Sequence, residues 1–489
     1  MKVASEGSHR IEAYTIMVVS FVIYSLFIVG TGLFSMKRRK DTDEDYVLAN
    51  RELGPWASSL SASASSESGW VMLGLVGLAF NSGLSAMWII PGIAAGYLFN
   101  WFVIAERIRK ESLRSGAVTL PQFIAGMFDS DSRLLRLIPV IVITAAMLGY
   151  VAAQMNAAGK AFEVTFALPY QSGVLVGAVI VLAYTVTGGF RAICWTDIIQ
   201  ASFMLVALIV MPLVMLSEVG GYEVFSSLLT ATDPNLLSLS GGMSGYGLLG
   251  FVIGMLGIGL GYPGQPHILS RFMAAKDSAT VKKAGAIAFV WMSLVYVGAI
   301  CFGMFARAYF GTLADAEQAL PLACTELLPP VLAGFVIAAI VAAICSTADS
   351  QLIVVSSVIS RDVFGWGKKE DRTSPEVIAR HQRLDRWVLV GLAVVAVFFA
   401  LTENRIIFDF VLYAWSGLGA AFGPVIILGL LWKKTTKQGA IAGMLTGAVV
   451  TVVWKNVEVL KAIVYELVPA FLLALALTWL VSLMTQKNE

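Results

Sequence analysis

The stretch that decides the fold is Gly257-Ile258-Gly259-Leu260-Gly261-Tyr262-Pro263-Gly264-Gln265-Pro266, inside a long apolar segment. Its four glycines and two prolines preclude a regular helix, because proline removes a backbone hydrogen bond and glycine costs about 1 kcal/mol relative to alanine. An earlier apolar segment holds a second interruption, Ala64-Ser65-Ser66-Glu67-Ser68-Gly69-Trp70. Both stretches predict broken helices inside a membrane. The alternatives are a simple kink at 257–266 and a serine-rich packing face at 64–70.

The composition of the whole chain excludes a soluble protein. Of the 489 residues, 58% are hydrophobic and only 13% are charged, whereas about 25% is usual in soluble domains. A net charge of +2 gives no reason to expect a nucleic-acid partner. The sequence shows no nucleophile–base pair and no cluster of metal ligands, so we do not expect an enzyme. We predict an all-α polytopic membrane protein.

Thirteen segments have the length and apolar character of a membrane span, which takes about 20 residues. They begin near residues 13, 56, 84, 134, 171, 193, 244, 284, 329, 386, 407, 438 and 465. Lysine and arginine gather in cytoplasmic loops. The basic segment Lys37-Arg38-Arg39-Lys40 after the first span therefore predicts an external N-terminus and a cytoplasmic C-terminus.

The two breaks lie five spans apart, so the broken helices run in opposite directions. This is typical of an inverted-repeat transporter, in which unwound carbonyls bind cations and half-helix N-termini face anionic groups. We expect one transmembrane domain over residues 1–489. Its predicted parts are a peripheral first span, a first repeat at about 51–217, an inverted repeat at about 244–432, and two peripheral spans at about 438–484.

Polar residues at membrane depth are expensive and usually functional. Ser346, Thr347 and Asp349 offer three oxygen-bearing side chains within about one helical turn of the ninth span, a composition that suits a hard cation. The alternative for the hydroxyls is bonding to the preceding turn. Asp197, at the start of the sixth span, fits equally well as an N-cap.

Several motifs resemble those of the sodium/solute symporter family, in particular its bacterial proline-transporting members. They are Leu53-Gly54-Pro55, Ser68-Gly69-Trp70, Gly188-Gly189-Phe190, Trp195-Thr196-Asp197, Gly264-Gln265-Pro266-His267-Ile268-Leu269, Arg271-Phe272-Met273-Ala274-Ala275 and Tyr413-Ala414-Trp415-Ser416-Gly417. The resemblance extends from about residue 21 to the last span. It implies a leucine-transporter-like fold with thirteen helices, alternating access, sodium as coupling ion, no other cofactor, and a bacterial inner membrane.

The resemblance also implies two sets of site residues. The sodium ligands would be the backbone carbonyls of Ala64, Glu67 and Ala343 and the hydroxyls of Ser346 and Thr347. The substrate pocket would be formed by Ser68, Gly69, Trp70, Gly74, Tyr150, Ile258, Tyr262, Pro263, Gln265 and Pro266. A possible second cation site, known from some members, would use Asp197, Ser346, Asp349 and Ser350.

Some positions depart from the proline-transporting pattern, which has Asp at Ser66, Met at Glu67, Trp at Ile258, Phe at Pro263 and Ser at Asp349. We expect sodium-driven import of a small zwitterion, with L-proline first. The alternatives are another amino acid, betaine, a short monocarboxylate, or a transporter-like membrane sensor. Sodium, the solute and the lipid bilayer are the expected partners, with no obligate protein partner.

Overall fold

The computed structural model describes residues 2–36, 42–130, 132–365, 374–402 and 406–486, and nearly all of them are helical. The part of the chain so described forms no β-strand, and one isolated bridge joins Leu53 to Ala275. The basic segment 37–40, on which the predicted orientation begins, lies outside the described residues. The all-α prediction is confirmed.

The helices have the following bounds. They are α1 (Lys2–Met36), α2 (Asp43–Leu48), α3 (Pro55–Ser66), α4 (Val76–Ser82), α5 (Ile89–Phe99), α6 (Ala105–Ser115), α7 (Leu120–Met127), α8 (Arg133–Phe166), α9 (Tyr170–Val219), α10 (Tyr222–Thr232), α11 (Gly245–Gly257), α12 (Pro266–Met273), α13 (Ser278–Phe310), α14 (Ala319–Leu327), α15 (Pro330–Val358), α16 (Pro375–Thr402), α17 (Ile407–Leu431), α18 (Lys437–Asn456), α19 (Glu458–Lys461) and α20 (Leu467–Thr485).

The first predicted break separates α3 from α4. Helix α3 begins with Pro55 at its first position, where a missing N–H costs nothing, and it ends at Ser66; Glu67 follows as the C-cap with φ −96° and ψ 47°. The chain then continues through a wider π-helical turn, η2 (Trp70–Leu75), into α4. Such turns are frequent at functional sites. The serine-rich segment is therefore helical only up to the predicted interruption.

The second predicted break separates α11 from α12. Helix α11 ends at Gly257, a tight 3₁₀ turn η6 (Ile258–Gly264) follows, and Pro266 opens α12. Glycine is needed at position 261, because an added Cβ would come within 1.9 Å of Trp415 Nε1. The close approach of α17 to the turn thus explains why residues 257–266 include a glycine at position 261.

Ten segments of the described residues are long and apolar enough to cross a membrane. Three predicted spans account for the difference from thirteen: the segment Trp70–Ser115 is helical without a gap and counts once, Tyr170–Ala183 is the short first part of α9, and α18 is not among the ten. Helix α9 bends at Gly189, whose φ of 64° is open to glycine, where the sequence predicts the boundary between two spans. Thirteen spans stay a prediction.

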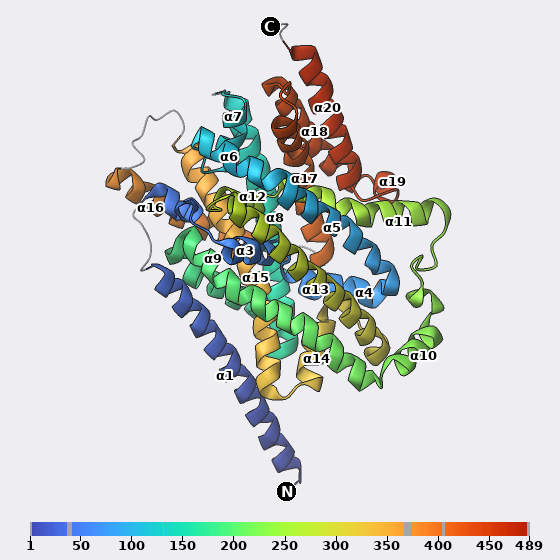
Figure 1. Cartoon of the computed structure of the whole chain (residues 1–489). Helices are drawn as coiled ribbons and strands as arrows, with labels where there is room; N and C mark the ends of the chain where they lie inside the picture. Colours follow the sequence, from blue (N-terminus) through green and yellow to red (C-terminus); the bar gives the residue numbers. More distant parts are fainter. Residues whose placement is uncertain (1, 37–41, 131, 366–373, 403–405, 487–489) are drawn as a thin grey trace.

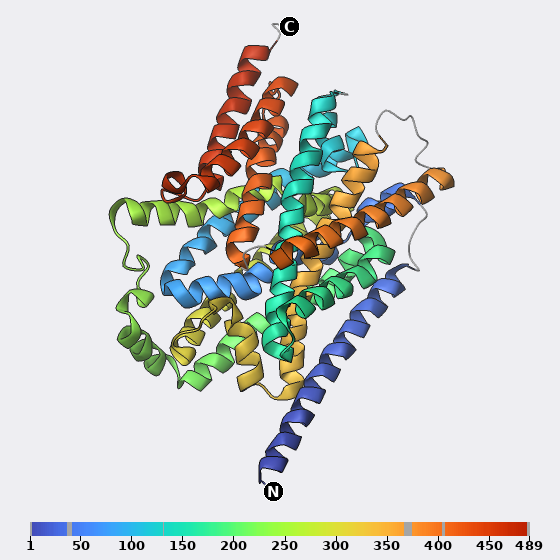
Figure 2. The ribbon, with the colours of Figure 1, turned by 180° about the vertical axis from the view of Figure 1, so that it is seen from behind.

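Helix α15 lies in the middle of the molecule and α1, α18 and α20 lie at its periphery (Figures 1 and 2). In the apolar window of Pro330–Val363, 83% of the residues are buried, compared with 28% in that of Tyr14–Ser35. A helix that is apolar on all sides and buried belongs to a core. The polar residues of α15 therefore face other helices, and their hydrogen-bond partners show where a polar site could lie.

Candidate cation and substrate sites

The break after α3 meets the middle of α15. The Ser346 hydroxyl donates hydrogen bonds to Ala64 O at 2.9 Å and to Ala343 O at 3.2 Å. The Thr347 hydroxyl donates to Ala64 O at 3.2 Å and to Ser65 O at 3.1 Å. All of these residues are buried. Four of the five predicted sodium ligands are thus brought together, and their oxygens retain lone pairs that a hard cation could share.

Glu67 is the fifth predicted ligand, through its backbone carbonyl, and its side chain makes a different set of contacts. The carboxylate oxygen Oε1 accepts hydrogen bonds from Tyr97 at 2.6 Å, Ser66 at 3.0 Å and Tyr262 at 3.1 Å. The other oxygen, Oε2, accepts one from Tyr296. Sequence reasoning missed Tyr97 and Tyr296, because nothing in an apolar segment shows which tyrosines converge in space.

A glutamine from α8 supports the unwound segment between α3 and η2. Gln154 is buried, its Oε1 accepts a hydrogen bond from Gly69 N at 3.1 Å, and its Nε2 donates one to Ser68 Oγ at 3.2 Å. The same hydroxyl accepts a bond from Trp70 N at 3.2 Å. The backbone groups freed by the break are therefore satisfied from a neighbouring helix. The only sequence signal for Gln154 is an amide inside an apolar span.

The predicted substrate residues Trp70 and Gly74 pack against α17. The Trp70 ring lies 5.8 Å from the Phe408 ring and 6.0 Å from the Tyr296 ring, measured between centroids. The Trp70 indole donates to Ser66 O at 3.1 Å. A Cβ added at Gly74 would meet Phe408 at 3.2 Å. Phe408 thus packs against both residues at the end of this broken helix.

The predicted residues of the second break surround Trp415 of α17. The Trp415 indole donates to Ile258 O at 3.0 Å, and its ring contacts that of Tyr262 at 4.8 Å. Gln265 Nε2 donates to Trp415 O at 3.0 Å. Pro263 is buried within η6 and Pro266 begins α12. Helix α17 therefore contacts both broken helices.

Polar atoms without partners lie next to this second break. His267 is fully buried, and neither of its ring nitrogens has a hydrogen-bond partner among the residues that the structure describes. The same holds, within those residues, for Gln265 Oε1. The predicted pocket residue Tyr150 faces the His267 ring at 6.2 Å. Buried polar groups are normally satisfied, so such atoms indicate a place for a polar ligand. The sequence analysis did not single out His267 as a pocket residue.

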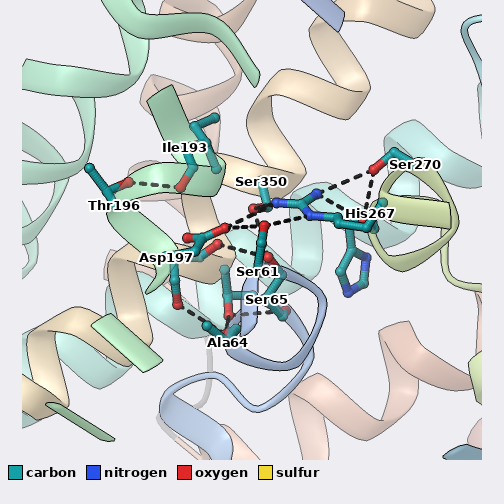
Figure 3. Close-up of polar contacts among 12 residues, drawn as sticks. Ser61, Ala64, Ser65, Ile193, Thr196, Asp197, His267, Ser270 and Ser350 are labelled. Carbon is teal, nitrogen blue, oxygen red and sulfur yellow. Dashed lines mark hydrogen bonds and ion pairs between the residues drawn. The ribbon is translucent and has the colours of Figure 1, made fainter. Parts of the chain in front are cut away.

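The predicted second cation group contains an arginine that sequence reasoning did not anticipate. The Arg271 guanidinium donates to Ser350 Oγ at 2.6 Å and forms an ion pair with Asp197 Oδ2 at 3.3 Å. Ser61 joins the group, donating to Asp197 at 2.6 Å. Figure 3 shows Asp197, Ser61 and Ser350 converging on this point. Asp349 lies close enough to interact electrostatically with Asp197.

This architecture, with two broken helices beside polar clusters, is typical of secondary transporters. A Na⁺-coupled sialic acid symporter in a substrate-bound outward-open state shares the fold, with a TM-score of 0.79 and 16% identity over 97% of this chain and 98% of that one. MhsT in complex with L-phenylalanine gives a TM-score of 0.56 and 15% identity, over 88% and 98% of the two chains. The leucine-transporter-like fold is confirmed.

The sequence identifies the family. The profile of the Sodium:solute symporter family matches residues 46–447. The high-affinity proline transporter PutP of Bacillus subtilis is 37% identical over 460 residues, 93% of this chain and 95% of its own. The sodium/proline symporter of Escherichia coli is 37% identical over 470 residues, 94% and 91% of the two chains. The protein belongs to the sodium:solute symporter family.

Proposed function

We propose that the protein imports L-proline, or a closely similar zwitterion, together with sodium across a bacterial inner membrane. Relatives that are 37% identical over more than nine-tenths of this chain carry the names of proline transporters, which supports the substrate. The observation that carries the mechanism is the convergence of the Ser346 and Thr347 hydroxyls on Ala64 O at the break after α3.

A sodium ion bound at these oxygens would connect α3 to α15. Because it would contact both helices, it would favour the arrangement in which they are close together. A ligand shifts a conformational equilibrium only through such a difference in affinity. In this proposal Ala64, Glu67 and Ala343 supply carbonyl oxygens, and Ser346 and Thr347 supply hydroxyls. The coupling follows because sodium fixes the broken helix beside the pocket.

We infer that the solute binds between the two broken helices. The set comprises Ser68, Gly69, Trp70, Gly74, Tyr150, Ile258, Tyr262, Pro263, Gln265 and Pro266, to which we add His267. The unpartnered nitrogens of His267 and the oxygen of Gln265 support a polar, zwitterionic solute. The amino end of α12 adds a partial positive charge that suits a carboxylate.

Alternating access in this proposal uses the contact between Trp70 and Phe408 as a closed gate on the predicted outer side. A pocket of about 450 Å³ lies beyond it and is lined by Gly74, Lys160, Glu317 and Phe408, among others. Lys160 forms ion pairs there with Asp315, at 2.8 Å, and with Glu317. We propose this pocket as the outer vestibule, with the N-terminus outside and the C-terminus in the cytoplasm.

The domain division stays as predicted from the sequence. Spans two to six would form one repeat and spans seven to eleven an inverted copy, with the first and the last two spans outside. The breaks after Ser66 and Gly257 support this division, because each interrupts the opening helix of its repeat.

The second cation site at Asp197, Ser346, Asp349 and Ser350 also remains a proposal. In the described conformation the Arg271 guanidinium already supplies positive charge there. Sodium would therefore bind in this place only after Arg271 moves. Asp349→Ala should then lower the Hill coefficient for sodium in uptake assays, and an unchanged coefficient would contradict a site at Asp349.

Uptake of labelled proline into proteoliposomes that contain the purified chain tests the function. We expect accumulation above the external concentration with an inward sodium gradient and none with choline. Unlabelled proline should compete, while other amino acids, betaine and acetate should compete less. Equilibration without sodium would indicate a uniporter, binding without flux a sensor, and stronger competition by another solute a different substrate.

A further inference from the structure

We propose that Glu67 and Asn100 bind one sodium ion at a position separate from the hydroxyl–carbonyl site at Ala64. The position is a small cavity lined by Asn100, which precedes α6, and by three residues whose hydroxyls bond to the Glu67 carboxylate, namely Ser66, Tyr97 and Tyr262. The inference deepens the proposed sodium coupling and rests on it for its role in transport. Ion binding itself can be measured without any transport.

The first reason is an uncompensated buried charge. The Glu67 side chain is 0% exposed, and the hydrogen bonds it accepts within the described residues come from neutral hydroxyls. No lysine, arginine or histidine of those residues forms an ion pair with it. An isolated carboxylate in a low-dielectric interior is costly unless a cation accompanies it. A sodium ion bound beside Glu67 would compensate this charge, which protonation of the carboxyl would otherwise remove.

The second reason is that the surrounding hydroxyls are held in place. Tyr97 belongs to α5, Tyr262 to η6 and Tyr296 to α13, so three different elements converge on one carboxylate. The rings of Tyr97 and Tyr262 pack edge to face at 4.7 Å. A hydroxyl that donates to a carboxylate still has lone pairs for a cation. The cage thus offers several oxygens at fixed positions.

The third reason is an unpartnered amide oxygen that lines a small cavity. Asn100 is 1% exposed and donates through Nδ2 to Tyr262 O at 3.3 Å, which fixes the orientation of the amide. Its Oδ1 accepts no hydrogen bond from any group that the structure describes. Ser66, Tyr97 and Tyr262 line the same cavity, which has room for about one water-sized occupant.

The size and chemistry of this cavity select a monovalent ion. The cavity is lined by amide and hydroxyl oxygens, and the hydroxyls bond to the Glu67 carboxylate; such oxygens suit a hard cation rather than a transition metal. One carboxylate neutralises a single positive charge, whereas a divalent ion would leave an excess charge in the membrane. A water molecule would satisfy Asn100 but leave the charge of Glu67. The secondary ammonium of proline is part of a ring too large for a cavity of this size.

Equilibrium binding of ²²Na⁺ to the purified full-length protein, without proline, tests the assignment. Glu67→Gln keeps the size of the side chain but removes its charge, and we expect it to bind one sodium fewer than the wild type. Ser346→Ala weakens the site at Ala64 instead, and the double variant should show both losses. Glu223→Gln, at an exposed position of α10, is the matched control and should bind as the wild type does.

Asn100→Ala gives an independent measurement in case Glu67→Gln does not fold. It keeps the carboxylate and removes the amide oxygen, so the affinity of that one position should fall by about tenfold or more. The same number and affinity of bound sodium ions in a folded Glu67 or Asn100 variant would overturn the proposal. So would a loss of proline binding at saturating sodium with the sodium count unchanged, because the carboxylate would then bind the solute.

Failure of this inference is distinguishable from failure of the proposed function. If the wild type binds sodium and both variants bind it equally well, only the Glu67 position is wrong. If the wild type binds no sodium at all, the proposed coupling fails with it.

Discussion

Asp197 and Glu67 are two fully buried carboxylates of the same core, and their surroundings differ in one respect. Asp197 faces the guanidinium of Arg271 at 3.3 Å, so it has a positively charged partner within the protein. Glu67 accepts hydrogen bonds only from hydroxyls among the described residues. We therefore expect Asp197 to contribute to the stability of the fold, and Glu67 to depend on a bound ion.

The largest effect should come from removing the compensating charge. Arg271→Met leaves Asp197 buried without its cation, which costs about 3–5 kcal/mol when one partner of a buried pair is lost. The double variant Arg271→Met/Asp197→Asn should recover most of this loss. Unfolding of the purified protein, followed for both single variants and the double variant, measures the coupling. A single variant as stable as the wild type would show that the pair has no structural role.

The next effect concerns the sodium site at the first break. Ser346→Ala and Thr347→Ala each remove an oxygen that would face the ion, and contacts with a charged group contribute about 1.5–3 kcal/mol. We expect the sodium concentration for half-maximal proline uptake to rise about tenfold or more. Ser356→Ala is the matched control, because this α15 hydroxyl donates to Ile353 O of its own helix at 3.1 Å. Equal sodium dependence in all three variants would refute the site.

A smaller effect concerns a compensated carboxylate outside the membrane spans. Burial alone would raise the pKa of Asp43, but the nearby His381 ring and the Arg361 guanidinium outweigh it and hold that pKa below its usual value. A lowered pKa stabilises the fold above the unfolded-state pKa of about 4, and the stabilisation is lost as the pH falls through the folded-state pKa. Asp43→Asn should therefore cost about 1 kcal/mol or more at pH 7. The difference in the free energy of unfolding between the variant and the wild type should shrink at acidic pH. Thermal unfolding at pH 7 and in acid measures this change.

The smallest expected effect is the stability of Glu67→Gln without sodium. Because no cation is lost with the charge, the free energy of unfolding of the variant should lie within about 1 kcal/mol of the wild-type value, or above it. Added sodium chloride should then stabilise the variant less than the wild type, since each bound ion contributes RT ln(1 + [Na⁺]/Kd). Choline chloride is the control for ionic strength. Destabilisation as large as that of Arg271→Met would place Glu67 among the structural carboxylates.

The sequence predicts the breaks well, because proline and glycine act locally on the backbone. The ends of α3 at Ser66 and of α11 at Gly257 lie inside the predicted interruptions. The meeting of Ala64 with Ser346 and Thr347 follows from the family resemblance and agrees with the contacts in the structure. The sodium role of these residues stays a prediction.

Side-chain partners could not be predicted in the same way. Tyr97, Asn100 and Tyr296 lie on helices that are largely apolar, so the sequence gives no periodicity that shows which face meets Glu67. Arg271 appears in a recognisable motif, yet its distance of 74 residues from Asp197 conceals the ion pair. Such contacts depend on how helices pack, which local sequence patterns do not determine.

The ratio of sodium to proline carried in each transport cycle tests the central claim most directly. Reversal potentials in proteoliposomes, with sodium and proline gradients set independently, measure this ratio for the wild type and for Glu67→Gln. We predict that the variant still transports proline with sodium but carries one sodium ion fewer per proline. An identical ratio in the two proteins would contradict a sodium position at Glu67.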